Sequence, residues 1–166
     1  MTSGSFSKTD TPALEYIGGV LGLYPRMALI GRLHPLLVHF PIALILIAAV
    51  AELLAMATRT REWRAVAVAN LRAGAAFAVA STAAGWLLAS SRIVEASPSL
   101  ESHRWLGTYA AVLAIAAACT TGRVVSRPSQ RLTWAYRVAV FCAAGLVGVA
   151  GHFGAVLVWG ADFLRP

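Results

Sequence analysis

The sequence predicts an all-α integral membrane protein, an up-down bundle of four transmembrane helices preceded by an interfacial segment. Hydrophobic residues make up 58% of the 166 residues and charged residues 13%, and the mean hydropathy is +0.70. A soluble domain of this composition would lack a polar surface. Four stretches of about 20 residues, the length that crosses a bilayer core of about 30 Å as helix, are nearly free of charge. Short connections between them require neighbouring helices to run antiparallel.

Residues 1–33 are expected to form a tail and an interfacial segment, and residues 34–166 the four-helix domain. The polar start MTSGSFSKTD has no signal-peptide pattern. Residues 12–30 are apolar but are interrupted by three glycines and Pro25. We therefore expect this segment to lie in the membrane interface, partly as helix. No internal repeat or second domain is visible.

The four spans are expected at residues 35–58, 65–90, 103–122 and 134–162. Pro35 fits the first position of a helix, whereas Pro41 lacks a backbone N–H and should bend or loosen the first turns. Glu52 interrupts the first span, and Arg72 lies near the start of the second. Because the two lie at similar depth, we expect them to form an ion pair that pins these helices.

The arginines predict the orientation of the bundle. The connections 1–2 and 3–4, with their flanking turns, hold eight arginines and one acid. The N-terminal segment, the 2–3 connection and the C-terminal tail hold six basic residues and five acids. By the positive-inside rule both termini face the periplasm, and the protein is a multi-pass component of the bacterial cytoplasmic membrane. The formal charge of +7 therefore reports topology, and no nucleic-acid partner is expected.

All four histidines are predicted to lie in the periplasmic half of the bundle. His34 and His39 open the first span, His103 opens the third, and His152 stands about ten residues before the end of the fourth. Ionisable residues inside spans are costly, and four independent packing roles would have no reason to share one leaflet. We interpret the set as a shared cofactor site, with hydrogen-bonded packing as the alternative.

Haem b suits this set, because two imidazoles on facing helices can ligate its iron where small residues admit the porphyrin. In the fourth span Gly145, Gly148 and His152 are spaced by three and four residues and share one face. The third span presents a similar stripe, formed by His103, Gly107, Ala110, Ala114 and Ala117. Close helix packing is the alternative explanation for such stripes, since the second span has one (Gly74, Ala78, Thr82) without a histidine.

The spacing also limits the choice of ligands. His34 and His39 are five residues apart, about 140° around an ideal helix, so we do not expect both to reach one metal. We predict His39 as a buried ligand and His34 as a capping or interfacial residue. The expected axial ligands are two of His39, His103 and His152. Arg104 is expected either to pair with haem propionates or to anchor the helix at the interface.

Two other functions stay open. The same histidines, with His39, His103 and His152 as the metal ligands, could hold copper or zinc, although no cysteine lies near them. In a cofactor-free subunit of a membrane complex they would instead bond one another, carbonyls or water. No residue set typical of hydrolysis or phosphate binding is present. We therefore expect an electron-transfer or binding subunit rather than a stand-alone enzyme, either as a homo-oligomer or within a larger complex.

The residues LHPLLVHFPIALILIA resemble the opening of a family of bacterial membrane proteins, the domain-of-unknown-function family 2231. Its members resemble four-span bundles with an HPxxVHFP pattern, a histidine opening the third span and a Gly-rich ending similar to GHFGAVLVWG. The resemblance covers about residues 31–162. The matching positions are His34, Pro35, Val38, His39, Phe40, Pro41, His103, Gly151, His152, Gly154 and Gly160.

Some members of that family resemble fusions to cytochrome c-type or other redox modules. The resemblance implies electron transfer on the periplasmic side. Together with the histidines, it leads us to expect a cytochrome b-like membrane protein. Such a protein would pass electrons between the quinone pool or a membrane enzyme and a periplasmic partner.

Overall fold

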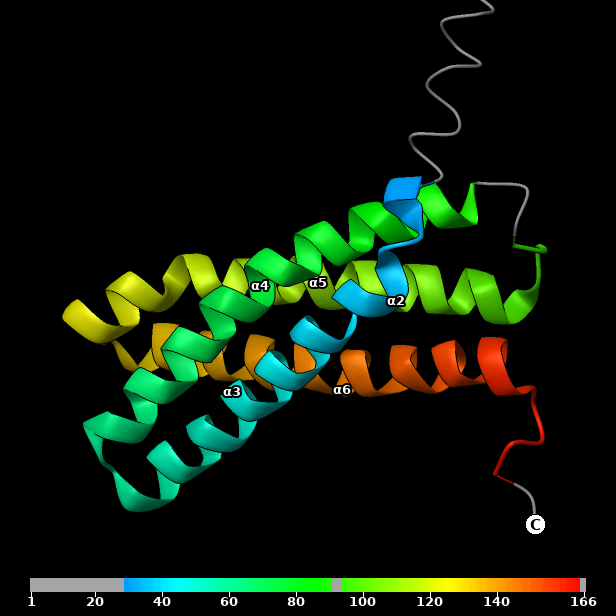
Figure 1. Cartoon of the computed structure of the whole chain (residues 1–166). Helices are drawn as coiled ribbons and strands as arrows, with labels where there is room; N and C mark the ends of the chain where they lie inside the picture. Colours follow the sequence, from blue (N-terminus) through cyan, green and yellow to red (C-terminus); the bar gives the residue numbers. More distant parts are fainter. Residues whose placement is uncertain (1–28, 91–93, 165–166) are drawn as a thin grey trace, which may run out of the picture.

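A computed structural model describes residues 29–90 and 94–164, and within them the fold is all-helical (Figure 1). The helices are α2 (His34–Leu37), α3 (His39–Thr58), α4 (Arg61–Ala89), α5 (Pro98–Ser126) and α6 (Gln130–Trp159). The interfacial segment expected at residues 12–30 falls almost wholly outside the described residues.

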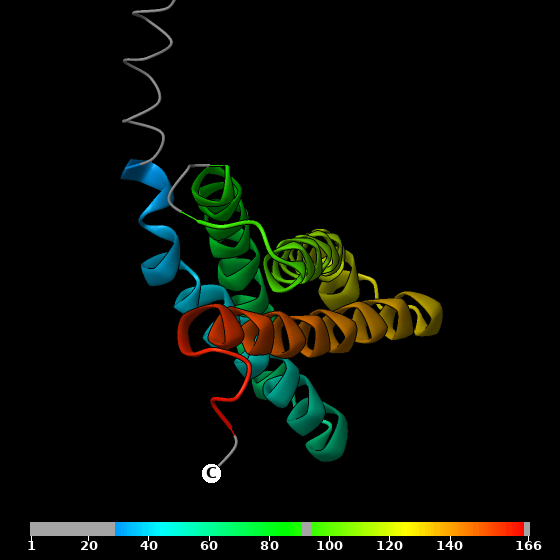
Figure 2. The same ribbon diagram turned by 90° about the vertical axis from the view of Figure 1, so that its right-hand side faces the viewer.

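The bundle consists of two helical hairpins. α3 packs against α4, and α5 packs against α6; the hairpins then meet through α4 with α5 and through α3 with α6. The two hairpins cross at an angle, so that they diverge toward the end that carries the α3–α4 and α5–α6 connections (Figures 1 and 2). We call the end where α2 and α5 begin the histidine end. The end that carries the α3–α4 and α5–α6 connections is the arginine end. Both ends of the described chain lie at the histidine end.

The helix boundaries follow local signals. α5 begins five residues before the expected position because Ser97 accepts a hydrogen bond from the Leu100 amide, and Pro98 follows it. α6 ends at Trp159, since Gly160 has a φ of 87°, which favours glycine. The first span is interrupted at Val38, three residues before Pro41, which confirms the expected loosening.

The core is narrow and consists largely of alanine. Its largest apolar side chains are Ile45, Leu71, Val140 and Tyr136. A Cβ atom on Gly74 would lie 2.9 Å from Cγ1 of Ile45, so the approach of α3 to α4 depends on this glycine. Small residues at such contacts are typical of helix packing in membranes.

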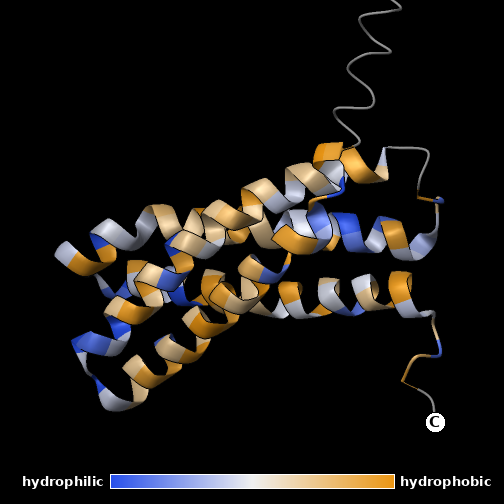
Figure 3. Ribbon diagram, viewed as in Figure 1, coloured by the Kyte–Doolittle hydropathy of each residue, from blue (hydrophilic) through white to orange (hydrophobic). Residues whose placement is uncertain are grey.

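The outside of the bundle is apolar along its middle, and hydrophilic residues gather toward the ends (Figure 3). Many large apolar side chains are exposed there, among them Val50, Val79, Val112 and Val138. Among the residues that the structure describes, four helices are long and apolar enough to cross a membrane, at Leu29–Thr58, Arg61–Ala89, Pro98–Ser126 and Gln130–Trp159. The predicted fold class is confirmed.

The ion pair of Glu52 differs from the prediction. Glu52 is fully buried; its Oε1 accepts a hydrogen bond from Nε of Arg137 (2.9 Å), and its Oε2 lies 2.8 Å from Nε of Arg64. The second contact is an ion pair without hydrogen-bond geometry. Arg72 is exposed and donates instead to Oγ1 of Thr121 (2.9 Å). Glu52 therefore links α3 to both α4 and α6.

The expected Glu52–Arg72 pair is wrong because depth alone does not fix the direction of a side chain. The buried stripe of α4 includes Ala67 and Leu71. Arg64 lies three residues before Ala67 and continues this stripe. Arg72 directly follows Leu71 and is therefore turned about 100° away from it.

Candidate functional site

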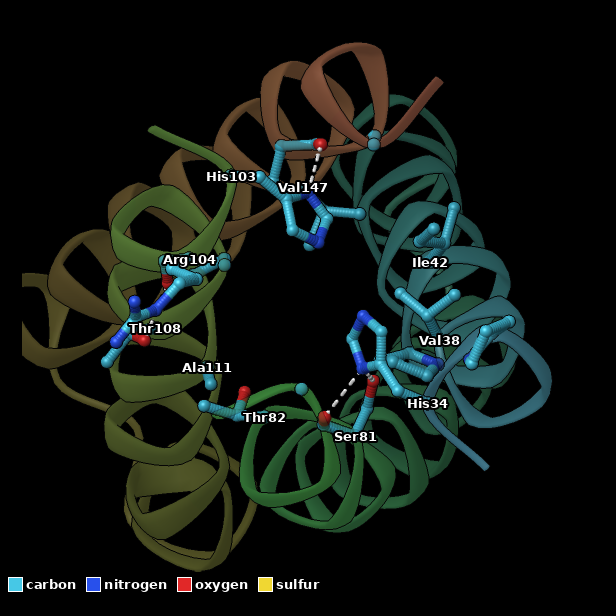
Figure 4. A pocket seen from close by; sticks show the side chains of 18 of the residues that line it. His34, Val38, Ile42, Ser81, Thr82, His103, Arg104, Thr108, Ala111 and Val147 are labelled. Atoms are coloured by element: carbon cyan, nitrogen blue, oxygen red, sulfur yellow. Dashed lines mark hydrogen bonds between the residues drawn. The ribbon is translucent and has the colours of Figure 1, made fainter. Parts of the chain in front are cut away.

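A cavity of about 490 Å³ lies inside the histidine end of the bundle (Figure 4). Its wall runs from Ala78 to Ala89 on α4, from Leu100 to Ala111 on α5 and from Val147 to Val158 on α6. Each range covers eleven residue steps, or about 16 Å of helix. α2 and the start of α3 close the remaining side. The wall is mostly apolar, and the volume lies in the range of small-molecule and cofactor sites.

His34 and His103 face one another across this cavity. Their ring centroids lie 5.8 Å apart, and the ring planes are 79° apart. His34 belongs to α2, which leads into α3, and His103 belongs to α5. Since α3 and α5 each pack against both α4 and α6, they are opposite members of the bundle. The two imidazoles thus approach from opposite sides.

Both imidazoles are held in the same tautomer. Nδ1 of His34 lies 2.8 Å from the Ser81 carbonyl oxygen, and Nδ1 of His103 lies 2.8 Å from that of Ala150. A carbonyl oxygen can only accept, so both Nδ1 atoms carry a hydrogen, and Nε2 of each neutral ring has a free lone pair. Both Nε2 atoms point into the cavity (Figure 4). Histidines that ligate metals are held in this way.

Each imidazole rests on a glycine of the neighbouring helix. A Cβ atom on Gly85 of α4 would lie 2.9 Å from the His34 ring. A Cβ atom on Gly154 of α6 would lie 3.2 Å from the His103 ring. Both glycines thus provide the space that the rings occupy.

The model of the family described as "Predicted membrane protein (DUF2231)" matches residues 32–163. The chain belongs to this family. The resemblance noted in the sequence is thereby confirmed, and the family's description leaves its function open. A search of curated proteins and a search of solved structures found no match.

The HPxxVHFP motif of this DUF2231 chain forms one wall of the cavity. His34 and Val38 line the cavity on one face of the helix, and the buried Pro41 continues that face. Phe40 points to the outside, where its ring stacks on that of Phe77 at 4.6 Å. The motif therefore places the His34 imidazole at the cavity and interrupts the helix at Val38, close to it.

The bundle contains an internal repeat that is not apparent in its sequence, with the α3–α4 and α5–α6 hairpins as the two halves. The His34 ring hydrogen-bonds the Ser81 carbonyl and lies against Gly85. Adding 69 to each of these residue numbers gives His103, Ala150 and Gly154, which make the same contacts. The same offset relates buried positions of the two hairpins, such as Ile45 and Ala114, Ala48 and Ala117, Leu71 and Val140, and Ala78 and Val147. The two imidazoles are therefore equivalent positions of two similar hairpins.

A third polar group lies at the cavity wall between α4 and α5. The Arg104 guanidinium lies 3.9 Å from the centroid of the Trp86 ring. Trp86 Nε1 donates to Oγ1 of Thr108 at 3.1 Å, and this hydroxyl donates to the Arg104 carbonyl at 2.7 Å. Nε of Arg104 is buried and has no hydrogen-bond partner among the residues that the structure describes. The site thus offers a positive group for an anion.

Other predicted site residues lie at the surface. His39 borders the cavity, but it is exposed rather than buried, and no described residue hydrogen-bonds its ring. His152 is exposed, does not line the cavity and contacts the rings of Phe153 and Phe163. Gly148 is exposed too and faces open space.

The expectation that Gly145, Gly148 and His152 form the cavity wall of α6 is therefore corrected. The inner face is the neighbouring one, which carries Val147, Gly151 and Gly154. His103, Gly107 and Ala110 do line the cavity as expected. Within residues 29–90 and 94–164, no group of three or more His, Cys, Asp or Glu side chains is placed to hold a metal ion.

We expect the stability of the protein to depend on the space that Gly85 leaves for the His34 ring. Gly85→Ala should lower the free energy of unfolding by about 1–3 kcal/mol, because the new Cβ displaces the imidazole. Gly148→Ala, in open space on a helix, should leave the stability unchanged or raise it by up to about 1 kcal/mol. Reversible unfolding in mixed micelles measures both. Equal effects of the two substitutions would contradict this account of the site.

Proposed function

We propose that this DUF2231 protein binds one haem b between His34 and His103 and transfers electrons. The observation that carries the proposal is the pair of Nε2 lone pairs that meet in one cavity from opposite helices. Each ring is oriented by a backbone carbonyl, as in ligating histidines. Of the expected ligands, His103 is retained in this assignment, and His34 takes the place of His39.

The separation of the rings suits a shared metal. With metal–nitrogen bonds of about 2.0 Å and a ring radius of about 1.2 Å, two imidazoles on opposite sides of one ion have centroids about 6.4 Å apart. The observed 5.8 Å is shorter by about 0.6 Å, so a small outward shift of the two rings would place one ion between them. The 79° between the ring planes is set by the two Nδ1–carbonyl hydrogen bonds, and it does not oppose ligation, because two ligands on opposite sides of one metal need not be coplanar.

The cavity also suits a flat, mostly apolar cofactor. It extends about 16 Å along the bundle, and small residues such as Gly107, Ala110 and Gly151 line it beside the imidazoles. The unpartnered Nε of Arg104 would pair with a propionate. A haem with two axial histidines has no open coordination position, which favours electron transfer over ligand activation.

A spectrum and a metal analysis test the proposal together. We expect protein purified in mild detergent to show a Soret band, and resolved α and β bands on reduction, with one haem per chain. A copper ion on the same two Nε2 atoms is the second candidate, because the ring separation suits it as well. Copper at one per chain without haem absorption would favour that candidate. Neither haem nor metal would overturn both.

We further propose that the histidine end faces the periplasm and the arginine end the cytoplasm. This orientation rests on the arginines of the α3–α4 and α5–α6 connections. Electrons would then pass between a quinone-linked or other membrane donor and a periplasmic acceptor such as a cytochrome c-type protein. The chain would act as a subunit of a complex or as a homo-oligomer.

Labelling of single cysteines tests the orientation. In a chain with Cys119→Ser and Cys142→Ser, we expect an impermeant thiol reagent to label Ala96→Cys in spheroplasts. Thr60→Cys should react only after permeabilisation. Both positions are exposed, the first before α5 and the second between α3 and α4. The reverse pattern would refute the proposed orientation.

A further inference from the structure

The cavity opens to the outside at one seam of the bundle. Of the described residues that line it, those with exposed side chains are Pro35 and His39, at the start of the first span, and Leu157 and Val158, at the end of α6. Pro35 and His39 are four residues apart and share one face of the first span. Val158 lies three residues after Ala155 on one face of α6, whereas Leu157 lies on another face of that helix. The lining residues of α4 and α5 are buried or half-buried.

The internal repeat supplies a comparison for this seam. The equivalent seam, between α4 and α5, is closed by Trp86, Arg104 and Thr108, which stack on or hydrogen-bond one another. At the offset that relates His34 to His103, Ala155 takes the place of Trp86, Pro35 that of Arg104, and His39 that of Thr108. A large indole is thus replaced by a methyl group at the open seam.

The residues at the open seam suit a lipid-soluble ligand. Its borders are apolar, on helices long and apolar enough to span a membrane. The exception is the His39 imidazole, which has no hydrogen-bond partner among the described residues. An acyl chain would need no such group, whereas the carbonyl or hydroxyl oxygen of a ring head group would use it.

We propose that this seam is a lateral portal at which the head group of a quinone or quinol from the bilayer reaches the edge of the cavity, beside the space between His34 and His103 that a haem would fill, with His39 hydrogen-bonded to a head-group oxygen. The choice of the quinone class rests on the proposed electron-transfer function. The portal itself rests on the exposure of its lining residues and on Ala155.

Photolabelling with an azido-quinone tests the portal without depending on haem. The purified protein is labelled in nanodiscs, digested and mapped by mass spectrometry, with decylubiquinone as competitor. We expect the label on the segments around Pro35–Ile42 and Gly154–Val158, displaced by the competitor. Label spread evenly over all lipid-facing surfaces would overturn the proposal. So would a bound phospholipid that decylubiquinone does not displace.

Three substitutions sharpen the test. Ala155→Trp should reduce labelling of the seam at least tenfold, while Val149→Trp, on the exposed face of α6, leaves it unchanged. His39→Leu should weaken decylubiquinone binding by about tenfold, and His152→Leu should not. Trp86→Ala should create new labelling between α4 and α5 that decylubiquinone displaces, whereas labelling of a misfolded chain would not be displaced. Unchanged labelling in Ala155→Trp and in His39→Leu would refute the portal.

The two proposals fail in different ways. Specific, displaceable labelling of a protein without haem would leave the portal standing and remove the haem proposal. A haem-loaded protein with unspecific labelling would leave the haem proposal standing and remove the portal.

Discussion

His34→Ala and His103→Ala are each expected to abolish haem binding, while His39→Ala and His152→Ala retain it. The first two remove one of the Nε2 atoms that point into the cavity. Their loss should exceed the roughly 10–100-fold cost of removing only an outer hydrogen-bond partner of a ligand. The two control residues are exposed and lie outside the facing pair. Haem content per chain, from the pyridine haemochrome spectrum, measures the effect.

A loss of haem through misfolding must be separated from a loss of ligation. His103→Gly, supplied with free imidazole during reconstitution with haemin, should regain the low-spin spectrum, because the small molecule replaces the missing ligand. A merely structural histidine would not be rescued in this way. Retention of the wild-type spectrum in both His34→Ala and His103→Ala would refute the ligand assignment.

Glu52→Gln is expected to destabilise the bundle by about 3–5 kcal/mol. Glu52 is fully buried between Arg64 and Arg137, so the substitution leaves two guanidinium groups without a counter-charge. The free energy of unfolding, measured by reversible denaturation in mixed micelles, checks the magnitude. Glu62→Gln is the matched control, because Glu62 is exposed in the first turn of α4. It should change the stability by less than about 0.5 kcal/mol.

A triple substitution tests whether the cost comes from unpaired charge. Glu52→Leu combined with Arg64→Met and Arg137→Met removes all three ionised groups. This chain should recover most of the stability that Glu52→Gln loses, because buried ion clusters are often replaceable by apolar residues of similar volume. If the triple variant is less stable than Glu52→Gln, the ion cluster itself stabilises the fold, and this explanation is wrong.

The fold was predictable from the sequence because its determinants are local and repeated. Four long apolar stretches with short connections admit few arrangements, and the length of a span is set by the bilayer. The ends of the helices were less predictable. Ser97 and Pro98 signal the true start of α5, but hydropathy alone places that start at the first apolar turn. Gly160 signals the end of α6 in the same way.

The site was predictable only in outline. The gathering of the histidines at one end follows from antiparallel helices, but the rotation of each helix does not. His34 was expected to be a capping or interfacial residue, yet its ring reaches the Ser81 carbonyl and the space above Gly85. The stripe of small residues on α4 has no histidine of its own. It continues to Gly85, which receives the ring of His34 from α2.

The internal repeat is hard to recognise in the sequence because its two halves share few identical residues. At the offset that relates the two hairpins, Pro35 corresponds to Arg104 and Glu52 to Thr121. What the halves share is the burial pattern and the contact of a histidine with a carbonyl and a glycine. The spacing from His34 to Gly85 equals that from His103 to Gly154, and at the same offset Ala48 and Ala49 match Ala117 and Ala118, so a sequence comparison had these signals to use.

The coordination state of the purified protein tests the central claim most directly. If His34 and His103 both supply Nε2 to one haem, the ferric protein is low-spin by electron paramagnetic resonance. The ferrous protein keeps its spectrum when carbon monoxide is added, because no coordination position is open. A protein without haem, or one whose ferrous form binds carbon monoxide as a five-coordinate haem does, would contradict the account.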